Sequence, residues 1–223
     1  MLIVALDPPP TIDVYNWMLD RVTGLADLVQ GFKVGLPAII RLGVNEINKV
    51  FKNYNGLLIA DLKLADIGDV MALTTEILYE YGFNAVIAHS FIGFSQALET
   101  LSIKCKELNM KLITVVSMTH QGSMEFIDKH VDEFLNISKV IGSWGIVAPA
   151  TRIDLLRYIR EQRKEVKILS PGIGVQGAEP GIALCNGADY EIVGRLITYS
   201  QDFRKSALKV LEMQKKKVVE CQI

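Results

Sequence analysis

Asp61, Lys63 and Asp66 place two carboxylates and one ammonium group within six residues. They follow the apolar run 57–60, which predicts a short buried strand. Because residues two apart on a strand face the same side, Asp61 and Lys63 are expected to leave the strand end together, with Asp66 in the following turn. Such a cluster at the mouth of an apolar layer can shift pKa values, hold a charged substrate and move a proton.

A plainer interpretation is that these charges form an ion-pair network that only fixes a loop. Two features argue against it. The charges lie where a strand leaves the core, and burying charge there without a use is costly. A further cation, Lys33, ends the preceding predicted strand. An alternating chain of Lys33, Asp61, Lys63 and Asp66 would keep each ion paired while excluding water, so we expect a functional cluster.

Short apolar runs alternate with longer amphipathic segments along the chain. The runs that predict strands are Leu2–Leu6, Leu28–Val34, Leu57–Asp61, Ala85–His89, Lys111–Ser117, Gly145–Ala148, Lys167–Ser170 and Tyr190–Val193. The helical patterns between them include Val70–Tyr81, Ser95–Leu108, Ile153–Arg163 and Phe203–Lys215. Eight strands alternating with helices predict a parallel sheet, and eight strands close a (β/α)8 TIM barrel. We therefore predict an α/β protein with one catalytic barrel domain over residues 1–223; a doubly wound open sheet is the alternative.

Polar and glycine residues gather directly after the predicted strands. These positions are Asp7, Lys33, Asp61, Lys63, His89, Thr119, His120, Pro171–Gly174 and Gly194–Arg195. In a parallel barrel they fall at the carboxyl ends of the strands, the face that carries barrel active sites. Of the two histidines at these positions, His89 is expected to be a hydrogen-bonded core residue, and His120 is expected to fix its loop.

The glycine-rich segment Pro171–Gly174 follows the seventh predicted strand, and Gly194-Arg195 ends the eighth. Taken alone, the glycine-rich segment would be an ordinary turn. The loops after strands seven and eight form the common phosphate site of barrels, where backbone N–H groups meet a cation. Because Arg195 can bind a phosphate through two hydrogen bonds, we predict a phosphate site here.

Composition limits the remaining function classes. A formal net charge of −1 gives no basic field for nucleic acid, and the only basic run, Lys215–Lys217, is too short to argue for a membrane surface. No apolar run approaches the roughly 20 residues that span a bilayer, and Leu2–Leu6 lacks the basic lead-in of a signal peptide. The cysteines, Cys105, Cys185 and Cys221, show no zinc spacing, and their odd number fits a reducing cytoplasm. A soluble, cytoplasmic protein is expected.

The polar motifs, taken in order, resemble those of the orotidine 5'-monophosphate decarboxylases. They are Ala5–Asp7, Phe32–Gly35, Asp61–Gly68, Ser117–His120, Ser170–Gly177 and Ile192–Arg195. The Asp-x-Lys-x-x-Asp element is shared with related barrel enzymes, whereas the full ordered set is highly specific and covers nearly the whole chain. The resemblance implies a homodimer that converts orotidine monophosphate to uridine monophosphate and carbon dioxide, the last step of de novo pyrimidine nucleotide synthesis, without metal or organic cofactor.

The resemblance also implies catalytic roles. Lys63 would protonate the carbon that loses the carboxylate, and Asp61 would lie against that carboxylate. Lys33 would join the network and contact the ribose. Asp66, with Ile67 beside it, would enter the site of the partner subunit, so that each site needs both chains.

Binding roles follow from the same resemblance. The implied substrate-binding residues are Asp7, Ile67, Thr119, Pro171, Gly174, Gln176, Gly194 and Arg195. Asp7 would bind the ribose hydroxyls and Thr119 the pyrimidine. Gln176 and Arg195 would hold the phosphate, with an N–H group from Gly194. Binding of the phosphate would close the loop 171–180 and exclude water.

One departure and two alternatives remain. Val70 stands where family members often carry a threonine that joins the ribose contacts, which puts one polar contact in doubt. The first alternative is a magnesium-dependent sister enzyme, a 3-keto-gulonate 6-phosphate decarboxylase or a hexulose-phosphate synthase. Those enzymes typically carry a glutamate ligand at the position of Lys33, and a lysine there argues against a divalent cation. The second is a catalytically silent barrel that only binds nucleotides or a partner protein.

Overall fold

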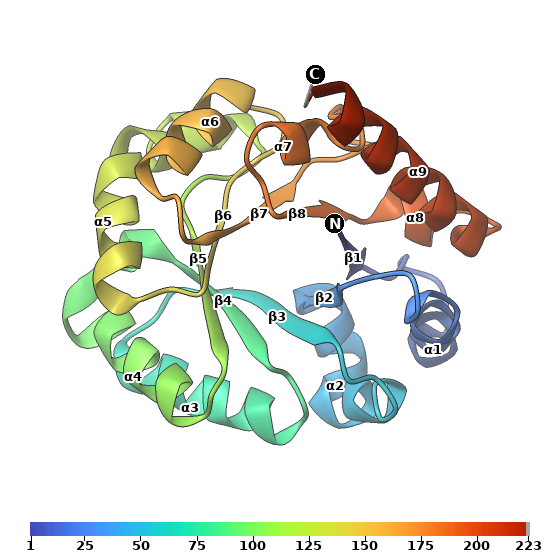
Figure 1. The fold of residues 1–223 in the computed structure, drawn as a ribbon. Coiled ribbons are helices and arrows are strands. Elements are labelled where there is room, and N and C mark those ends of the chain that lie inside the picture. Colours follow the sequence, from blue (N-terminus) through green and yellow to red (C-terminus); the bar gives the residue numbers. More distant parts are fainter. Residues whose placement is uncertain (222–223) are drawn as a thin grey trace.

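The computed structural model describes residues 1–221 and shows a closed barrel of eight parallel strands surrounded by helices (Figure 1). The strands are β1 (Leu2–Leu6), β2 (Gly31–Gly35), β3 (Leu57–Leu64), β4 (Ala85–His89), β5 (Lys111–Val115), β6 (Gly145–Val147), β7 (Lys167–Pro171) and β8 (Tyr190–Val193). Each strand pairs with the next, and β1 also pairs with β8. The predicted (β/α)8 barrel is confirmed, and the open sheet is excluded.

Helices cover the outside of the barrel. They are α1 (Val14–Leu25), α2 (Leu36–Val50), α3 (Gly68–Glu80), α4 (Glu99–Glu107), α5 (Val131–Ile141), α6 (Ile153–Gln162), α7 (Ile182–Cys185), α8 (Arg195–Thr198) and α9 (Phe203–Cys221). Short helical turns, η1 (Ser90–Ile92), η2 (Phe94–Leu98), η3 (Gln121–Met124) and η4 (Ile127–His130), lie in the loops after β4 and β5. None of the helices within residues 1–221 combines the length and apolar character needed to cross a bilayer.

The core has two layers because alternate residues of each strand point to opposite faces of the sheet. Inward-facing side chains, such as Ile59, Ile113 and Ile192, fill the barrel interior. Their neighbours, such as Val193, pack against the helices in a larger outer layer. Burial on both faces explains why the strands are continuously apolar rather than alternating with polar residues.

Some predicted bounds shift in the structure. β2 begins at Gly31 rather than Leu28, and β3 runs on to Leu64. The pairing of β3 with β4 changes register between Ala60 and Leu64, as at a β-bulge, and this allows the charged residues to stay within the strand. α9 continues to Cys221, beyond the predicted end at Lys215, because its last turns pack beside α7.

Cys185 and Cys221 form a disulfide that ties the end of α7 to the end of α9. The odd number and scatter of the cysteines did not indicate this pair. The two residues are 36 positions apart, and only the docking of α9 brings their Cα atoms to 5.9 Å. Cys105 remains as a buried thiol, and burial raises its pKa to about 12.

Candidate functional site

A cavity of about 290 Å³ opens at the carboxyl ends of the strands. Nine of the predicted site residues line it: Asp7, Lys33, Asp61, Lys63, Thr119, Pro171, Gln176, Gly194 and Arg195. Its floor is apolar and includes Ile87, Val115 and Ile192 from the barrel interior. An apolar cavity with a few convergent polar groups is the usual form of a small-molecule site.

Lys33, Asp61 and Lys63, here called the rim cluster, line this cavity together. The ammonium of Lys33 donates to Oδ2 of Asp61 at 2.6 Å, and that of Lys63 donates to Oδ1 at 2.7 Å. Lys33 and Asp61 are buried, whereas the side chain of Lys63 is 37% exposed. The predicted alternation of charges is thus present for three of its four members.

The electrostatics of the rim cluster keep Lys33 and Asp61 charged. Burial alone would lower the pKa of Lys33, but the carboxylates of Asp61 and Asp7 outweigh burial and raise that pKa above its ordinary value. Burial alone would raise the pKa of Asp61, but Lys33 and Lys63 outweigh it and lower that pKa. Around neutral pH the cavity therefore holds a carboxylate between ammonium groups rather than a neutral pair.

The backbone at Lys63 adopts a conformation that side chains rarely take. Its φ is +48°, in the left-handed region, at the register change of β3. Backbone strain of this kind persists where the surrounding structure enforces it, typically at functional sites. Here it accompanies the approach of the Lys63 ammonium to the Asp61 carboxylate, two residues earlier in the strand.

Asp7 lies directly beyond β1, next to the rim cluster. Its charge contributes to the raised pKa of Lys33. A Cβ atom at Gly35 would lie 2.8 Å from Oδ1 of Asp7, so only glycine leaves room for this carboxylate. The glycine that ends β2 is thus explained by the close approach of Asp7.

The residues predicted to bind phosphate lie on the loop 172–181 and at the start of α8, whereas the rim cluster comes from β2 and β3. The loop folds back on itself, with the N–H of Gly174 donating to the carbonyl of Ala178 at 2.8 Å. Gln176 at its tip lines the cavity, as do Arg195, the first residue of α8, and Gly194. Gly174 does not line the cavity, because its N–H serves the turn and its φ of +80° belongs to the fold of the loop.

Asp66 and Ile67 are not in this chain's own cavity. Both are exposed, and Asp66 accepts a hydrogen bond from the N–H of Ile67 at 2.7 Å. They line a separate groove with Gln96 and Thr100. We expected Asp66 to follow Lys63 in an alternating chain of charges, and within residues 1–221 this prediction is wrong. The turn after β3 carries Asp66 away from the cavity.

A polar network that we did not predict fixes the segment before Thr119. Asp128 accepts hydrogen bonds from the hydroxyls of Ser117 and Ser123 at 2.7 and 2.6 Å. Arg152 pairs with Asp128 at 3.3 Å and donates to Ser117 and to the carbonyl of Met118. Arg152 follows β6, the one strand without a predicted polar or glycine position at its carboxyl end. His120, expected to fix this loop, is exposed instead.

His89 differs from its prediction as a hydrogen-bonded core residue. Its Nδ1 is buried, with no hydrogen-bond partner within residues 1–221. Burial, followed by the charge of Lys63, lowers the pKa of His89 to about 4. The imidazole is therefore neutral at pH 7. It lies at the end of β4, tilted by 39° against the ring of Phe91, with 4.7 Å between the ring centroids.

The donor set of the rim cluster does not suit a divalent cation. Both carboxylate oxygens of Asp61 already accept from ammonium groups, and Lys33 would repel a cation. Across residues 1–221, no group of three or more His, Cys, Asp or Glu side chains is arranged to hold a metal ion. The cavity is built to hold an anion beside fixed positive charge.

Comparisons with known proteins agree on one family. The model of the orotidine 5'-phosphate decarboxylase / HUMPS family matches residues 1–210. The orotidine 5'-phosphate decarboxylase of Aeropyrum pernix is 43% identical over 208 residues, 90% of this chain and 83% of the relative. That of Pyrococcus furiosus is 38% identical over 216 residues, 95% and 96% of the two chains. The crystal structure of the Methanocaldococcus jannaschii orotidine 5'-monophosphate decarboxylase complexed with inhibitor BMP has a TM-score of 0.88, with 32% identity over 96% of this chain and 97% of that one.

Proposed function

This chain belongs to the orotidine 5'-phosphate decarboxylase / HUMPS family, and we propose that it converts orotidine 5'-monophosphate to uridine 5'-monophosphate and carbon dioxide in pyrimidine nucleotide synthesis. The observation that carries this proposal is the rim cluster, in which Asp61 holds Lys63 at the cavity with Lys33 behind it. Two relatives, 43% and 38% identical to this chain, are orotidine 5'-phosphate decarboxylases.

In the proposed reaction, Lys63 is the proton donor. The bond between the pyrimidine ring and its carboxylate breaks, carbon dioxide leaves, and the electron pair stays on the ring carbon. The ammonium of Lys63 stabilises that developing negative charge and then delivers its proton to the same carbon. Lys63 suits this role because its side chain is partly open to the cavity while Asp61 orients it.

Asp61 and Lys33 serve the same step as fixed charges. The carboxylate of Asp61 would lie beside the departing carboxylate and favour its loss, while it holds both ammonium groups in place. Because the three charges are already arranged before substrate arrives, little reorganisation is needed in the transition state. Lys33, the most buried cation of the cluster, would contact the ribose together with Asp7.

The remote phosphate would be bound by Arg195, Gln176 and the N–H of Gly194, with Pro171 and Thr119 shaping the cavity between phosphate and ring. Binding energy gained there can be used to close the loop 172–181 and exclude water from the reacting carbon. The N–H of Gly174, engaged within the loop, would contribute to loop shape rather than contact the phosphate directly.

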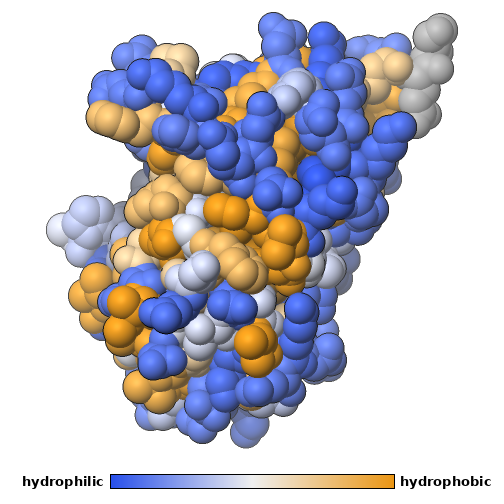
Figure 2. Space-filling model, turned by 90° about the vertical axis from the view of Figure 1, so that its left-hand side faces the viewer, coloured by the Kyte–Doolittle hydropathy of each residue, from blue (hydrophilic) through white to orange (hydrophobic). Residues whose placement is uncertain are grey.

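A homodimer is the proposed assembly, because Asp66 and Ile67 lie outside this chain's cavity. Ile67 is 64% exposed, and apolar residues with exposed side chains lie near it on α3 and beyond β4, including Val70, Leu73 and Phe91. Figure 2 shows apolar side chains among hydrophilic ones on the side that faces left in Figure 1. An apolar surface around Ile67 suits a partner subunit, into whose site Asp66 and Ile67 would reach.

We propose that the reaction needs neither metal nor organic cofactor, because Lys63 supplies both the positive charge and the proton. The family description also names HUMPS beside orotidine 5'-phosphate decarboxylase, so the sister-enzyme alternative has to be weighed. Lys33 favours the decarboxylase over a magnesium-dependent sister enzyme, since its ammonium occupies Asp61 and would repel the metal.

The direct test is to mix the purified protein with orotidine 5'-monophosphate and a chelator, and to follow the loss of orotate absorbance. Conversion to uridine monophosphate at a rate unchanged by the chelator is the expected result. Activity that appears only on a ketose phosphate with added magnesium would support the sister enzyme instead. Binding of uridine monophosphate without turnover of any of these substrates would indicate a silent barrel.

A further inference from the structure

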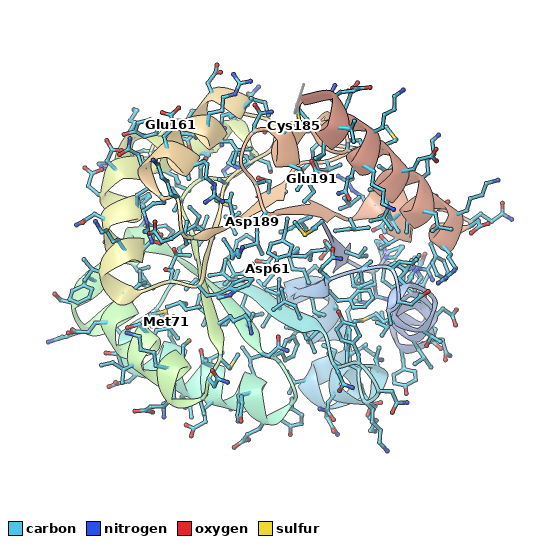
Figure 3. The ribbon with its side chains drawn as sticks, viewed as in Figure 1. Asp61, Met71, Glu161, Cys185, Asp189 and Glu191 are labelled. Atoms are coloured by element: carbon cyan, nitrogen blue, oxygen red, sulfur yellow. A yellow bond between two sulfur atoms is a disulfide. The ribbon has the colours of Figure 1, made fainter. Side chains whose placement is uncertain are left out.

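Glu191 is a fully buried carboxylate that lies outside the proposed catalytic cavity. It belongs to β8, where its neighbour Ile192 points into the barrel interior. Glu191 therefore points outward, toward the layer formed by α7 and α9 (Figure 3). A buried carboxylate in an apolar layer is costly unless hydrogen bonds stabilise it, so its partners indicate what it holds in place.

The partners of Glu191 come from the end of the loop 172–181 and from α9. The N–H of Gly181 donates to both carboxylate oxygens, at 2.9 and 2.8 Å. The N–H of Ala183 donates to Oε1 at 3.0 Å, and the side-chain amide of Gln214 donates to Oε2 at 2.9 Å. Two of these three donor groups are backbone amides at the point where the loop becomes α7.

Gly181 is also confined from its other side. Its φ is +93°, and a Cβ atom there would lie 2.5 Å from Cβ of Lys217 and 3.1 Å from Cα of Gln214. Gly181 is thus enclosed between the carboxylate of Glu191 and the surface of α9. This position cannot shift without breaking hydrogen bonds to Glu191 or pushing α9 away.

The loop itself has an exposed tip between two buried ends. Val175 is 58% exposed, and Gln176 beside it is exposed too, whereas Pro180 and Gly181 are buried. The other end is held where the N–H of Ala150 donates to the carbonyl of Pro171 at 2.8 Å. Gln176 can therefore reach the cavity only from a loop with two fixed ends, and Glu191 fixes the second of them.

We propose that Glu191 is a positioning residue for the phosphate-binding loop: it fixes Gly181 so that the loop carries Gln176 to the phosphate with little further ordering. This rests on the proposed function, in which the loop closes over a phosphate. Glu191 touches no reacting atom, and its effect passes entirely through the loop. An end fixed in advance reduces the entropy that binding must spend on ordering the loop.

The test compares the affinities of uridine monophosphate and uridine, which differ by the phosphate alone, in Glu191→Leu and in the unchanged protein. We expect Glu191→Leu to weaken the binding of uridine monophosphate about tenfold, which corresponds to the loss of one or two well-placed hydrogen bonds. The affinity for uridine should not change. In Glu191→Leu, uridine monophosphate should no longer protect the amides of residues 172–181 from hydrogen exchange. Glu191→Gln should retain both the affinity for uridine monophosphate and this protection, because its carboxamide oxygen still accepts from the N–H of Gly181.

Asn84→Ala is the matched control for lost stability. Asn84 also bridges backbone groups, with donation to the carbonyl of Gly56 and acceptance from the N–H of Leu58, both at 2.9 Å, but it lies away from the cavity. It should lower the melting temperature and leave both affinities unchanged. If Glu191→Leu behaves as Asn84→Ala does, Glu191 has only a structural role and the inference is overturned.

Two further outcomes are informative. The Cys185–Cys221 disulfide still ties α7 to α9 in Glu191→Leu, which favours a folded variant. If Glu191→Leu does not fold, Gly181→Ala can be used instead, because it displaces the same amide while Glu191 stays. We then expect the same selective loss of affinity for uridine monophosphate. An unchanged ratio of the affinities for uridine monophosphate and uridine would overturn the inference. An unmodified protein that neither binds uridine monophosphate nor decarboxylates its substrate would instead overturn the proposed function.

Discussion

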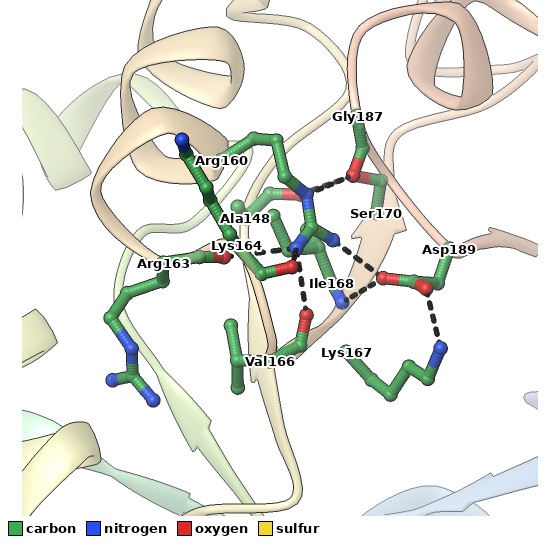
Figure 4. A network of polar contacts seen from close by, with 10 residues as sticks. All are labelled: Ala148, Arg160, Arg163, Lys164, Val166, Lys167, Ile168, Ser170, Gly187 and Asp189. Atoms are coloured by element: carbon green, nitrogen blue, oxygen red, sulfur yellow. Dashed lines mark hydrogen bonds and ion pairs between the residues drawn. The ribbon is translucent and has the colours of Figure 1, made fainter.

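Two clusters in this molecule place a carboxylate between two cations, at opposite ends of the barrel. In the rim cluster, Asp61 accepts from Lys33 and Lys63. At the amino ends of β7 and β8, Asp189 accepts from Arg160 at 2.6 Å and from Lys167 at 2.8 Å, a group here called the base network (Figure 4). By residue type alone, the two look equally suited to chemistry.

They differ in what their cations do with the remaining donor groups. Arg160 donates to the backbone carbonyls of Gly187, Arg163, Lys164 and Val166, and Asp189 also accepts from the N–H of Ile168. The base network therefore closes the end of α6 onto the sheet. Within residues 1–221, the ammonium groups of the rim cluster have no hydrogen-bond partner except Asp61, and they line a cavity. Unused donors facing a cavity, rather than ion pairs as such, distinguish a candidate site from a structural brace.

Removal of one lysine from each cluster should give the largest difference between them. Lys63→Ala should lower kcat by about 10⁴-fold or more, because it removes both the proton donor and the preorganised charge. Lys167→Ala removes the same side chain from an equivalent pair and should leave kcat unchanged. Steady-state decarboxylation assays on both variants, with circular dichroism to verify folding, measure this difference. Substantial activity in Lys63→Ala would exclude it as the proton donor.

Removal of the Cys185–Cys221 disulfide tests whether the link between the ends of α7 and α9 contributes to stability but not to activity. Cys221→Ser should lower the free energy of unfolding by about 4 kcal/mol, the effect expected for a disulfide that closes a loop of this size. Activity well below the melting temperature should not change. Thermal unfolding with and without a reductant gives the measurement, and reduced unmodified protein should match Cys221→Ser. A melting temperature insensitive to reductant would mean that the bond does not form in solution.

Asp189→Ala should affect stability where Lys63→Ala affects turnover. Loss of this carboxylate leaves Arg160, only 23% exposed, without its charged partner, and the N–H of Ile168 without an acceptor. We expect a loss of about 2 kcal/mol in unfolding free energy and an unchanged kcat for the folded fraction. Urea unfolding followed by fluorescence measures the first quantity. A large fall in kcat at full folding would show that the base network also supports catalysis.

The smallest expected effect concerns pH and His89. Its folded pKa of about 4 lies below the unfolded value of 6.5, so the unfolded chain binds the proton more readily. The stability that neutral His89 confers is therefore complete above pH 6.5 and is lost as pH falls toward 4. Since the side chain is only partly buried, we expect about 1–2 kcal/mol over this range rather than the full shift.

His89→Phe is the variant that isolates this effect. Urea unfolding at several pH values between 7.5 and 4 should show a flatter dependence in His89→Phe than in the unmodified protein. The lowered pKa of Asp61 acts below this range and the raised pKa of Lys33 acts above it, so neither obscures the comparison. Equal slopes for the two proteins would contradict the assignment of a neutral His89.

The barrel was predictable because each of its strands and helices can be identified from a short, continuous stretch of sequence. Each strand is a short apolar run, and the polar residues that follow the strands must meet at one rim once the sheet closes. This is why Lys33 and Asp61, 28 positions apart, were expected to approach one another, and the structure confirms it. The features that were missed depend on how separate segments dock.

Three of these misses share a physical cause. The Cys185–Cys221 bond requires α9 to pack on α7, and no local pattern predicts that contact. Asp66 turns away from the cavity because of backbone geometry after the register change in β3. Arg152 supports the segment before Thr119 through a partner in another loop, Asp128. Each depends on the direction of a side chain in three dimensions, which residue type and spacing do not specify.

The closure of the barrel also sets the order in which the site can be completed during synthesis. β1 pairs with β8, and the N–H of Glu191 donates to the carbonyl of Met1 at 2.9 Å. During synthesis, β1 therefore has no partner on this side until β8 has emerged. At ribosomal speeds of roughly 5–20 residues per second, about 10–40 seconds separate their emergence. Asp7 and Arg195 stand on the two sides of this seam. A nascent chain that already holds the rim cluster therefore cannot complete the cavity until β8 and Arg195 have left the ribosome.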